Sequence, residues 1–434
     1  MNIFLQSVTI IHKASPFHGK KADVLIKNGY IAAIAEPNHV QADASSQLIN
    51  GENLCLSVGW LDMRANFCDP GQEHKEDLYS GAHAAAAGGF TEVVLLPNTS
   101  PVIQSKNDIR YLQQDNGWPV TVHPVAAVTR NTAGEELTEM IDLYHAGAIA
   151  FSDGEYPLWN TQVMLKALQY MQKFDGLLMS KPEDRHLNTF GTMHEGIQST
   201  MLGMSGMPAL AEEIIVQRDL RLLMYASESS TRRVPRLHFS NISTAEAVAH
   251  IREAKGRGLQ VSCDVAAHQL YFDDTALSSF DTNYKVNPPL RDTEHQKALL
   301  EGVKDGTIDI IVSSHSPQDE ESKKCEFDLA AFGMIGLQTF FPMVNSIVTP
   351  SLPLDLLVTK FTEAPRKLLR LAAPQLEKEA VANLTLFSPD VSWVFDNENN
   401  FSKSNNSPLL GASLQGKVIG VFNKERYWLA EDSY

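Results

Sequence analysis

One stretch near the start of the chain decides the fold: residues 59–73, which read GWLDMRANFCDPGQE. It contains the apolar run Leu61 to Phe67, which predicts a buried strand. Side chains at alternate positions of a strand point to the same side, so Arg64 and Asn66 are expected to face one cavity together. Two histidines at this spacing would bind a metal ion, whereas a guanidinium repels a cation.

Length and composition set the broad class of the protein. The 434 residues are enough for one barrel of about 250 residues and a smaller domain. The net charge of −16 argues against nucleic acid or an anionic membrane surface as the main partner. Four scattered cysteines predict neither a disulfide framework nor a zinc finger. We find no signal peptide and no membrane-spanning run, which predicts a soluble cytoplasmic protein.

Strand-like and helix-like segments alternate through the central part of the chain. Helical patterns such as 77–87 and 208–225 separate most of the apolar runs. Eight such units predict a closed (β/α)₈ barrel, or TIM barrel, over residues 56–379. The eight apolar runs are 61–67, 91–96, 120–128, 148–152, 176–180, 236–242, 260–265 and 308–314.

Both ends of the chain are rich in short β-like runs. Residues 1–55 and 380–434 therefore predict one small β domain, a β-sandwich assembled from both termini. A polar stretch at residues 396–406 interrupts the second part and is expected to be a mobile loop.

Several motifs resemble those of the dihydroorotases, a family of the amidohydrolase superfamily. The resemblance covers nearly the whole chain and rests on LPNTSP at 96–101, HEG at 194–196, KVNPPLR at 285–291 and GMIGL at 333–337, besides the opening stretch. It implies a class I-like, amidohydrolase-type barrel, zinc, and hydrolysis of a ring amide in pyrimidine biosynthesis. It also implies a homodimer.

The residues at the family's metal-ligand positions differ from its pattern. Where the resemblance leads us to expect histidines or an aspartate, this chain has Arg64, Asn66, Lys181, Asn241 and Ser314. Asp153 is the one carboxylate that matches a bridging ligand of some members. For substrate binding, Asn98 and Asn287 match the family, whereas Cys68 stands at the position of an arginine.

Two interpretations of the cationic replacements follow. Arg64 and Lys181 either pair with the buried carboxylate of Asp153 or extend to solvent at the barrel mouth. The remaining histidines His238, His268 and His315 are interpreted as packing or surface residues rather than a relocated metal centre.

The changed ligand positions lead to a functional prediction with two alternatives. The prediction is a catalytically inactive dihydroorotase-like protein with no metal or other cofactor, no catalytic residues, and a structural or regulatory role beside aspartate transcarbamoylase. One alternative is an enzyme that needs no metal, with Cys68 or Ser314 as nucleophile. The other is an active dihydroorotase with an atypical site.

Overall fold

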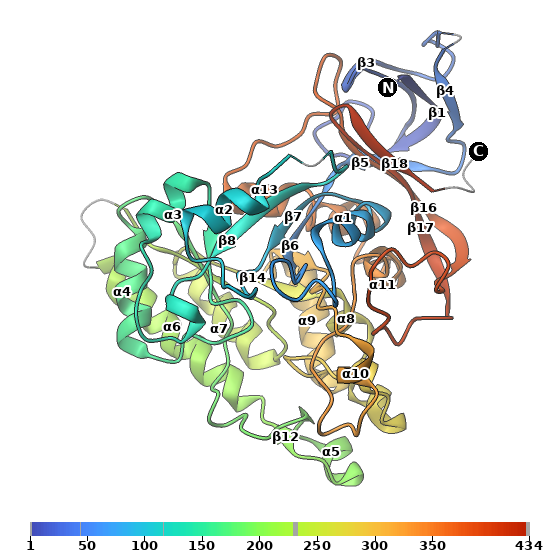
Figure 1. Ribbon diagram of the computed structural model, residues 1–434. Coiled ribbons are helices and arrows are strands. Elements are labelled where there is room, and N and C mark those ends of the chain that lie inside the picture. The colour runs from blue at the N-terminus through green and yellow to red at the C-terminus, as the bar shows by residue number, and fades with distance from the viewer. Residues whose placement is uncertain (1, 44, 116, 229–232, 431–434) are drawn as a thin grey trace.

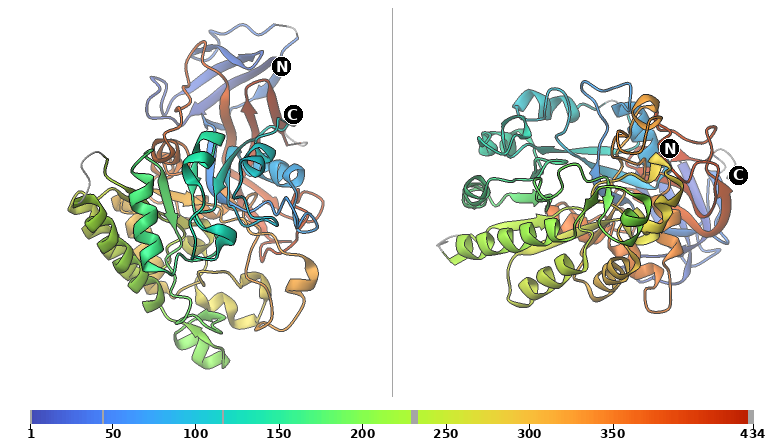
Figure 2. Two further views of the ribbon diagram at one scale, coloured as in Figure 1. Left: turned by 60° about the vertical axis from the view of Figure 1, so that its left-hand side comes forward. Right: turned by 90° about the horizontal axis from the view of Figure 1, so that it is seen from below.

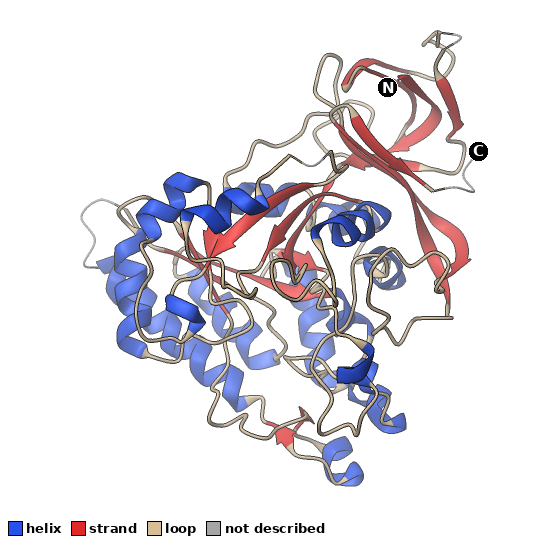
Figure 3. Ribbon diagram, viewed as in Figure 1, coloured by secondary structure: helices blue, strands red, loops and turns tan. Residues whose placement is uncertain are grey.

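The computed structural model describes residues 2–43, 45–115, 117–228 and 233–430 (Figure 1). A barrel with helices on its outside makes up most of the molecule, and a second sheet lies beside it (Figure 3). No described helix has both the length and the apolar character that crossing a bilayer requires.

Eight parallel strands form the barrel, in the order β15-β14-β13-β10-β9-β8-β7-β6. A bridge between Ala65 and His315 brings the first and last strands together. Every strand coincides with one of the eight predicted apolar runs, so the barrel prediction is confirmed. The strands are β6 (Trp60–Ala65), β7 (Phe90–Leu95), β8 (Thr121–Ala126), β9 (Ala150–Phe151), β10 (Leu177–Ser180), β13 (Arg236–Phe239), β14 (Val261–Ala266) and β15 (Ile310–Val312).

Helices pack around the barrel, as Figure 2 shows from two further sides. In α1 the side chain of Asp77 caps the first turn by accepting from the backbone of Ser80, and small alanines on its buried face allow close packing. The helices are α1 (Leu78–Ala87), α2 (Lys106–Leu112), α3 (Met140–Ala146), α4 (Thr161–Met171), α5 (Ile197–Leu202), α6 (Leu210–Glu228), α7 (Ala245–Gly256), α8 (Ala267–Tyr271), α9 (Thr293–Asp305), α10 (Glu320–Lys323), α11 (Phe340–Ser346), α12 (Leu354–Thr359) and α13 (Glu363–Leu369).

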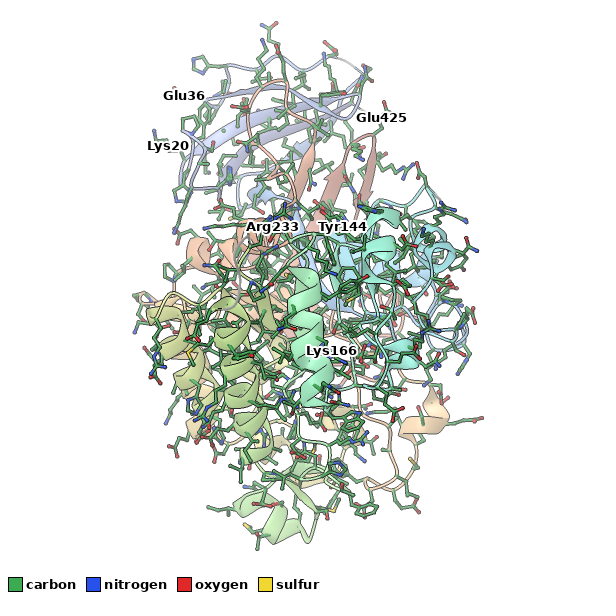
Figure 4. All side chains as sticks on the ribbon, turned by 90° about the vertical axis from the view of Figure 1, so that its left-hand side faces the viewer. Lys20, Glu36, Tyr144, Lys166, Arg233 and Glu425 are labelled. Atoms are coloured by element: carbon green, nitrogen blue, oxygen red, sulfur yellow. The ribbon has the colours of Figure 1, made fainter. Side chains whose placement is uncertain are left out.

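The second sheet has eight strands contributed by both ends of the chain. Seven follow the order β18-β17-β16-β5-β1-β2-β3, and β4 pairs with β1. In Figure 4, Lys20, Glu36 and Glu425 mark loops at the ends of these strands, whereas Lys166 lies on α4 of the barrel. Its strands are β1 (Asn2–Ile10), β2 (Lys21–Lys27), β3 (Tyr30–Ala35), β4 (Gln47–Asn50), β5 (Cys55–Val58), β16 (Asn383–Val394), β17 (Ser413–Asn423) and β18 (Arg426–Leu429).

Two of the short β-like runs near the end of the chain, 382–387 and 391–395, form one strand rather than two. Both fall almost entirely within β16, whose pairing register shifts between Ser388 and Ser392. Such an irregularity lets one strand change direction without ending. The proposed domain boundaries, 1–55 with 380–434 and 56–379, remain a prediction.

The polar stretch at 396–406 also differs from the prediction, because it is anchored to the barrel. The buried carboxylate of Glu76 accepts hydrogen bonds from the Ser402 hydroxyl and from the backbone of Lys403. The Ser404 hydroxyl donates to the backbone of Lys75, and Gln338 bonds the backbone of both Asn399 and Phe401. A carboxylate removed from water needs such donors, and this segment supplies them.

Residues 193–207 extend away from the barrel, at the end opposite the second sheet (Figure 1). They contain α5 and the short strands β11 (Met193–His194) and β12 (Gly206–Met207), which pair in parallel.

Candidate active site at the carboxyl ends of the barrel strands

The predicted site residues follow the carboxyl ends of four barrel strands, where enzymes of this fold place their catalytic groups. Arg64 is the second-last residue of β6, Lys181 follows β10, Asn241 follows β13, and Ser314 follows β15. Arg64, Lys181 and Asn241 are at most 4% exposed. These three side chains are therefore removed from solvent at the carboxyl ends of their strands.

Arg64 and Asn66 both contact one carboxylate, that of Glu155. The Arg64 Nη2 atom lies 3.0 Å from Glu155 Oε2, and the Asn66 amide donates to Glu155 Oε1 at 2.9 Å. This arrangement confirms that positions 64 and 66 face the same cavity. The Arg64 Nη1 atom also donates to the Ser240 hydroxyl at 3.2 Å.

Lys181 bridges two acidic residues on neighbouring strand ends. Its Nζ atom lies 2.8 Å from Glu183 Oε2 and donates to the backbone carbonyl of Glu155 at 3.0 Å. Burial alone would raise the pKa of Glu183, but the charge of Lys181 and its hydrogen bond hold it below the usual value. Glu183 is thus a half-buried anion matched by a buried cation.

These contacts show that the partners of Arg64 and Lys181 are Glu155 and Glu183 rather than the expected Asp153. Asp153 pairs with neither of them, because its carboxylate accepts hydrogen bonds from the backbone and hydroxyl of Thr129. Burial raises the pKa of Asp153 to about 6, against the lowering effect of those bonds. The alternative that Arg64 and Lys181 extend to solvent is also wrong, since both are buried.

Glu155 was missed by sequence reasoning, and a glycine turn explains its position. Gly154 adopts φ +65°, and a Cβ atom there would lie 1.8 Å from Asn98 Oδ1. The Asn98 amide spans this turn, accepting from the backbone of Glu155 and donating to the carbonyl of Asp153. An acidic residue directly after Asp-Gly at a strand end is the signal that could have identified it.

The two asparagines predicted to bind substrate make contacts within the protein. Asn98 uses both ends of its amide on the turn just described, and Asn287 donates to Glu183 Oε2 at 3.1 Å. Their ligand-binding role remains a prediction. Cys68 is buried with φ +56°, and burial raises the pKa of its thiol to about 12, which disfavours a reactive thiolate.

Asn241 and Ser314 lie next to each other, both in left-handed backbone conformations. The Asn241 amide nitrogen donates to the Ser314 hydroxyl at 3.2 Å, and the Asn241 backbone donates to Asp264. A small pocket of about 10 Å³ adjoins Asn241 and is also lined by Lys181, Glu183 and Arg291.

Of the three histidines interpreted above as packing or surface residues, two make polar contacts within the protein. His238 bonds Ser262 and Asp264, and His315 contacts Glu76 at 3.3 Å. His268 is 2% exposed and neither ring nitrogen has a protein hydrogen-bond partner. Burial, and then the charge of Arg64, lower the pKa of His268 to about 4, so its ring is neutral at pH 7.

The residues at the barrel mouth do not fit a metal ion. Arg64 and Lys181 bring positive charge to the position, and the amide nitrogen of Asn66 points at Glu155 as a donor. A different cluster, His194, Asp292 and His295, offers two imidazoles and a carboxylate within 4.8 Å of one another. It is the one group of this kind among the described residues.

The two histidine rings of this cluster already accept hydrogen bonds, which limits their ability to bind a cation. Arg291 donates to His194 Nδ1 at 3.1 Å, and the backbone N–H of Ala245 donates to His295 Nδ1 at 3.0 Å. Each neutral ring therefore carries its proton on Nε2 and has no lone pair left for a metal. Two imidazoles and a carboxylate are ligands that zinc prefers. To bind it through Nδ1, however, the rings would first have to lose their hydrogen bonds from Arg291 and Ala245.

Comparison with known proteins agrees with the fold and places the chain in a family. A family model described as dihydro-orotase-like matches residues 54–246. The chain is 39% identical over 436 residues to a dihydroorotase of Syntrophus aciditrophicus (strain SB), with 100% of both chains covered. It is 40% identical to a dihydroorotase of Pelotomaculum thermopropionicum (strain DSM 13744 / JCM 10971 / SI), with 96% of each covered.

Among solved structures, an L-hydantoinase (dihydropyrimidinase) from Arthrobacter aurescens superimposes with a TM-score of 0.81 at 20% identity, over 98% of this chain and 95% of that one. At this identity the likeness concerns the fold, which is that of the amidohydrolase-type barrels. The chain belongs to the dihydroorotase family.

Family membership corrects two predictions. The prediction of a catalytically inactive scaffold is wrong, because full-length relatives at 39% and 40% identity are dihydroorotases. The prediction of no cofactor is contradicted by the family, which normally uses zinc, and by the candidate cluster at His194. The candidate metal-binding residues are thus His194, Asp292 and His295 rather than those at the barrel mouth.

Proposed function

We propose that this protein catalyses the reversible hydrolysis of a cyclic amide of the dihydroorotate type, at an atypical site built on Arg64, Glu155 and Lys181. One observation carries the proposal: the chain aligns over its whole length with a dihydroorotase at 39% identity. The barrel mouth supplies charged groups at the strand ends where such chemistry takes place in this fold.

Glu155 is suited to act as the general base. Its side chain is 32% exposed, so water reaches it, whereas its partner Arg64 is buried. In the hydrolytic direction Glu155 takes a proton from water, whose oxygen forms a bond to the ring carbonyl carbon. The protonated carboxyl then returns the proton to the departing ring nitrogen as the C–N bond breaks. The reverse sequence closes the ring.

Arg64 and Lys181 are suited to stabilise the negative charge that develops on the carbonyl oxygen. Both are held in place by carboxylates, Glu155 and Glu183, so their charges are oriented before substrate arrives. Losing one such stabilising group typically costs a factor of about 10²–10³ in kcat.

The test is an assay in both directions, hydrolysis of dihydroorotate and cyclisation of carbamoyl aspartate, with zinc content measured on the same sample. We expect turnover by the native protein and a loss of about 10²–10⁴ in kcat for Glu155→Gln. Glu398→Gln, at an exposed site, serves as the matched control. Absence of turnover in both directions, with or without added zinc, overturns the proposal.

We also infer two associations from the family resemblance: a homodimer, and a complex with aspartate transcarbamoylase. Light scattering on the purified chain tests the first. Co-purification with the transcarbamoylase of the same organism tests the second, and a single monomeric species in both experiments contradicts them. Nucleic acid and membranes are not expected to bind, because the net charge is −16.

A further inference from the structure

Exposed apolar side chains are concentrated on the segment that extends from the barrel. Among the described residues, the four most exposed large hydrophobic side chains are those of Phe190, Ile197, Leu329 and Met201, each at least 74% exposed. Three of these four lie between positions 190 and 201, on or just before α5. Single exposed hydrophobic residues are common, but a group of them on one short segment indicates contact with another molecule.

Helix α5 has apolar side chains on two sides. Leu202, at its end, and Met204, just after it, pack against a buried cluster that includes Phe327. Ile197 and Met201, one turn apart on the same helix, are exposed instead. Apolar residues on two sides are typical of a helix packed between two bodies. The buried cluster is one of these bodies, and the exposed pair calls for a second.

Backbone hydrogen bonds hold this segment in a defined shape. The N–H of Thr192 donates to the carbonyl of Ser205 at 2.9 Å, and that of Glu195 donates to Met207 at 3.2 Å. These bonds join the chain before α5 to the chain after it. The exposed side chains are therefore positioned before any partner binds, which reduces the entropy lost on association.

The apolar surface continues onto the start of α6. The backbone of Asp184 donates to the carbonyl of Ala211 at 2.9 Å, which brings the chain before Phe190 beside this helix. Six exposed large hydrophobic side chains then supply much of the roughly 800 Å² per partner that a stable interface buries. They are Leu187, Phe190, Ile197, Met201, Leu210 and Ile214, and we call them the α5 surface.

The charge of the segment indicates which partner fits it. Residues 185–211 contain one arginine and one glutamate, Arg185 and Glu195, and no lysine or aspartate, whereas the whole chain carries a net charge of −16. Two copies of so acidic a chain repel one another, and a stretch without net charge is where they can approach most closely. A basic partner would be attracted to the acidic parts of the molecule instead.

We propose that the α5 surface binds the α5 surface of a second copy of this chain, in a dimer with twofold symmetry. An apolar surface is complementary to itself, so one patch can serve on both copies, as a twofold axis requires. The segment extends from the barrel at the end opposite the second sheet, where a second copy can reach it (Figure 1). This inference rests on the homodimer proposed above and assigns its interface.

The experiment measures the dissociation constant of the dimer by light scattering on the full chain over a range of concentrations. The double substitution Ile197→Asp and Met201→Asp should raise this constant at least about 100-fold, because the interface would bury carboxylates without partners. Phe190→Ser removes a different side chain of the same surface and should raise it about 10-fold. Leu48→Asp is the matched control, since this leucine is 55% exposed on β4 of the second sheet, and it should change nothing.

Melting curves on diluted, monomeric samples show whether the variants are folded, and exposed substitutions should leave the melting temperature unchanged. If the double variant is unfolded, Phe190→Ser decides. A native protein that stays monomeric overturns both the homodimer and its interface. A dimer that persists in both α5-surface variants, or that Leu48→Asp also dissociates, overturns the interface alone. Turnover is measured on the same samples: a native dimer without turnover overturns the proposed activity and leaves the interface standing.

Discussion

A buried arginine needs a compensating negative charge, because its guanidinium remains charged at any pH a protein tolerates. Arg64 is 1% exposed, so its charge must be matched nearby. Glu155 does this from a different strand end, after the glycine turn at Gly154. The sequence shows the cation plainly, but its partner depends on where two strand ends meet in space.

The Arg64–Glu155 pair leads to a prediction about stability. Glu155→Gln leaves Arg64 buried beside a neutral amide and should lower the free energy of unfolding by about 1–2 kcal/mol, less than for a fully buried pair because Glu155 is 32% exposed. Arg64→Met in the same chain should recover part of the loss. Urea denaturation of the single and double variants measures this as a coupling energy. Strictly additive effects would mean that the two side chains do not stabilise one another.

Gly154 is a second residue on which the site depends. Gly154→Ala places a methyl group against Asn98 Oδ1 and puts alanine at φ +65°. We expect the free energy of unfolding to fall by about 2–4 kcal/mol, from backbone strain and the loss of the Asn98 hydrogen bonds. Thermal unfolding compares it with Gly256→Ala, in helix α7, where a Cβ meets no atom within 4 Å and the effect should be neutral or stabilising. Equal effects of the two substitutions would contradict this account.

At the scale of elements, the polar segment 396–406 shows how a polar sequence becomes ordered. Its composition is that of a mobile loop, yet Glu76 lies buried beneath it and binds Ser402 and Lys403. Lys403 also donates to the backbone carbonyl of Glu73, the last residue of the opening stretch 59–73. The carboxylate that orders this segment is more than 300 residues away in the sequence, so local composition cannot reveal it.

This anchoring predicts protection from proteolysis. Glu76→Gln weakens the contacts with the segment and should speed trypsin cleavage after Lys403 about 10-fold, since each lost hydrogen bond is worth about 1 kcal/mol. Limited digestion followed by mass spectrometry locates the cut. Glu398→Gln, whose exposed side chain lies in the same segment, should leave the rate unchanged. Cleavage of both variants at the native rate would show that Glu76 does not hold the segment.

The barrel strands could be predicted individually because each depends on local pattern. Runs such as 61–67 and 308–314 are apolar and bounded by turns, and a buried parallel strand needs nothing more. The site could be predicted only in part: the positions of Arg64 and Lys181 follow from their strands, but that of Glu155 does not. Its role depends on contacts between the ends of different strands, which the sequence of one segment cannot show.

At the scale of the whole molecule, Glu92 connects the barrel to the second sheet. From β7 its carboxylate binds Arg366 of α13 at 2.6 Å and His123 of β8 at 2.7 Å. It also accepts from Asn383, the first residue of β16, at 3.0 Å. One buried anion therefore holds together two barrel strands, a barrel helix and the sheet formed by the chain ends.

Glu92 should make the stability of the whole protein depend on pH. Burial alone would raise its pKa, but His123 and Arg366 lower it from 4.5 to about 2. A lowered carboxyl pKa stabilises the fold fully above pH 4.5, and the contribution is lost as the pH falls from there through about 2. The shift corresponds to about 3 kcal/mol. Melting temperatures of the native protein and Glu92→Gln should therefore differ by a constant amount between pH 8 and 5, and by progressively less below pH 4.5. A difference that stays constant down to pH 3, or is equally large for Glu398→Gln, would show that the Glu92 charge does not stabilise this junction.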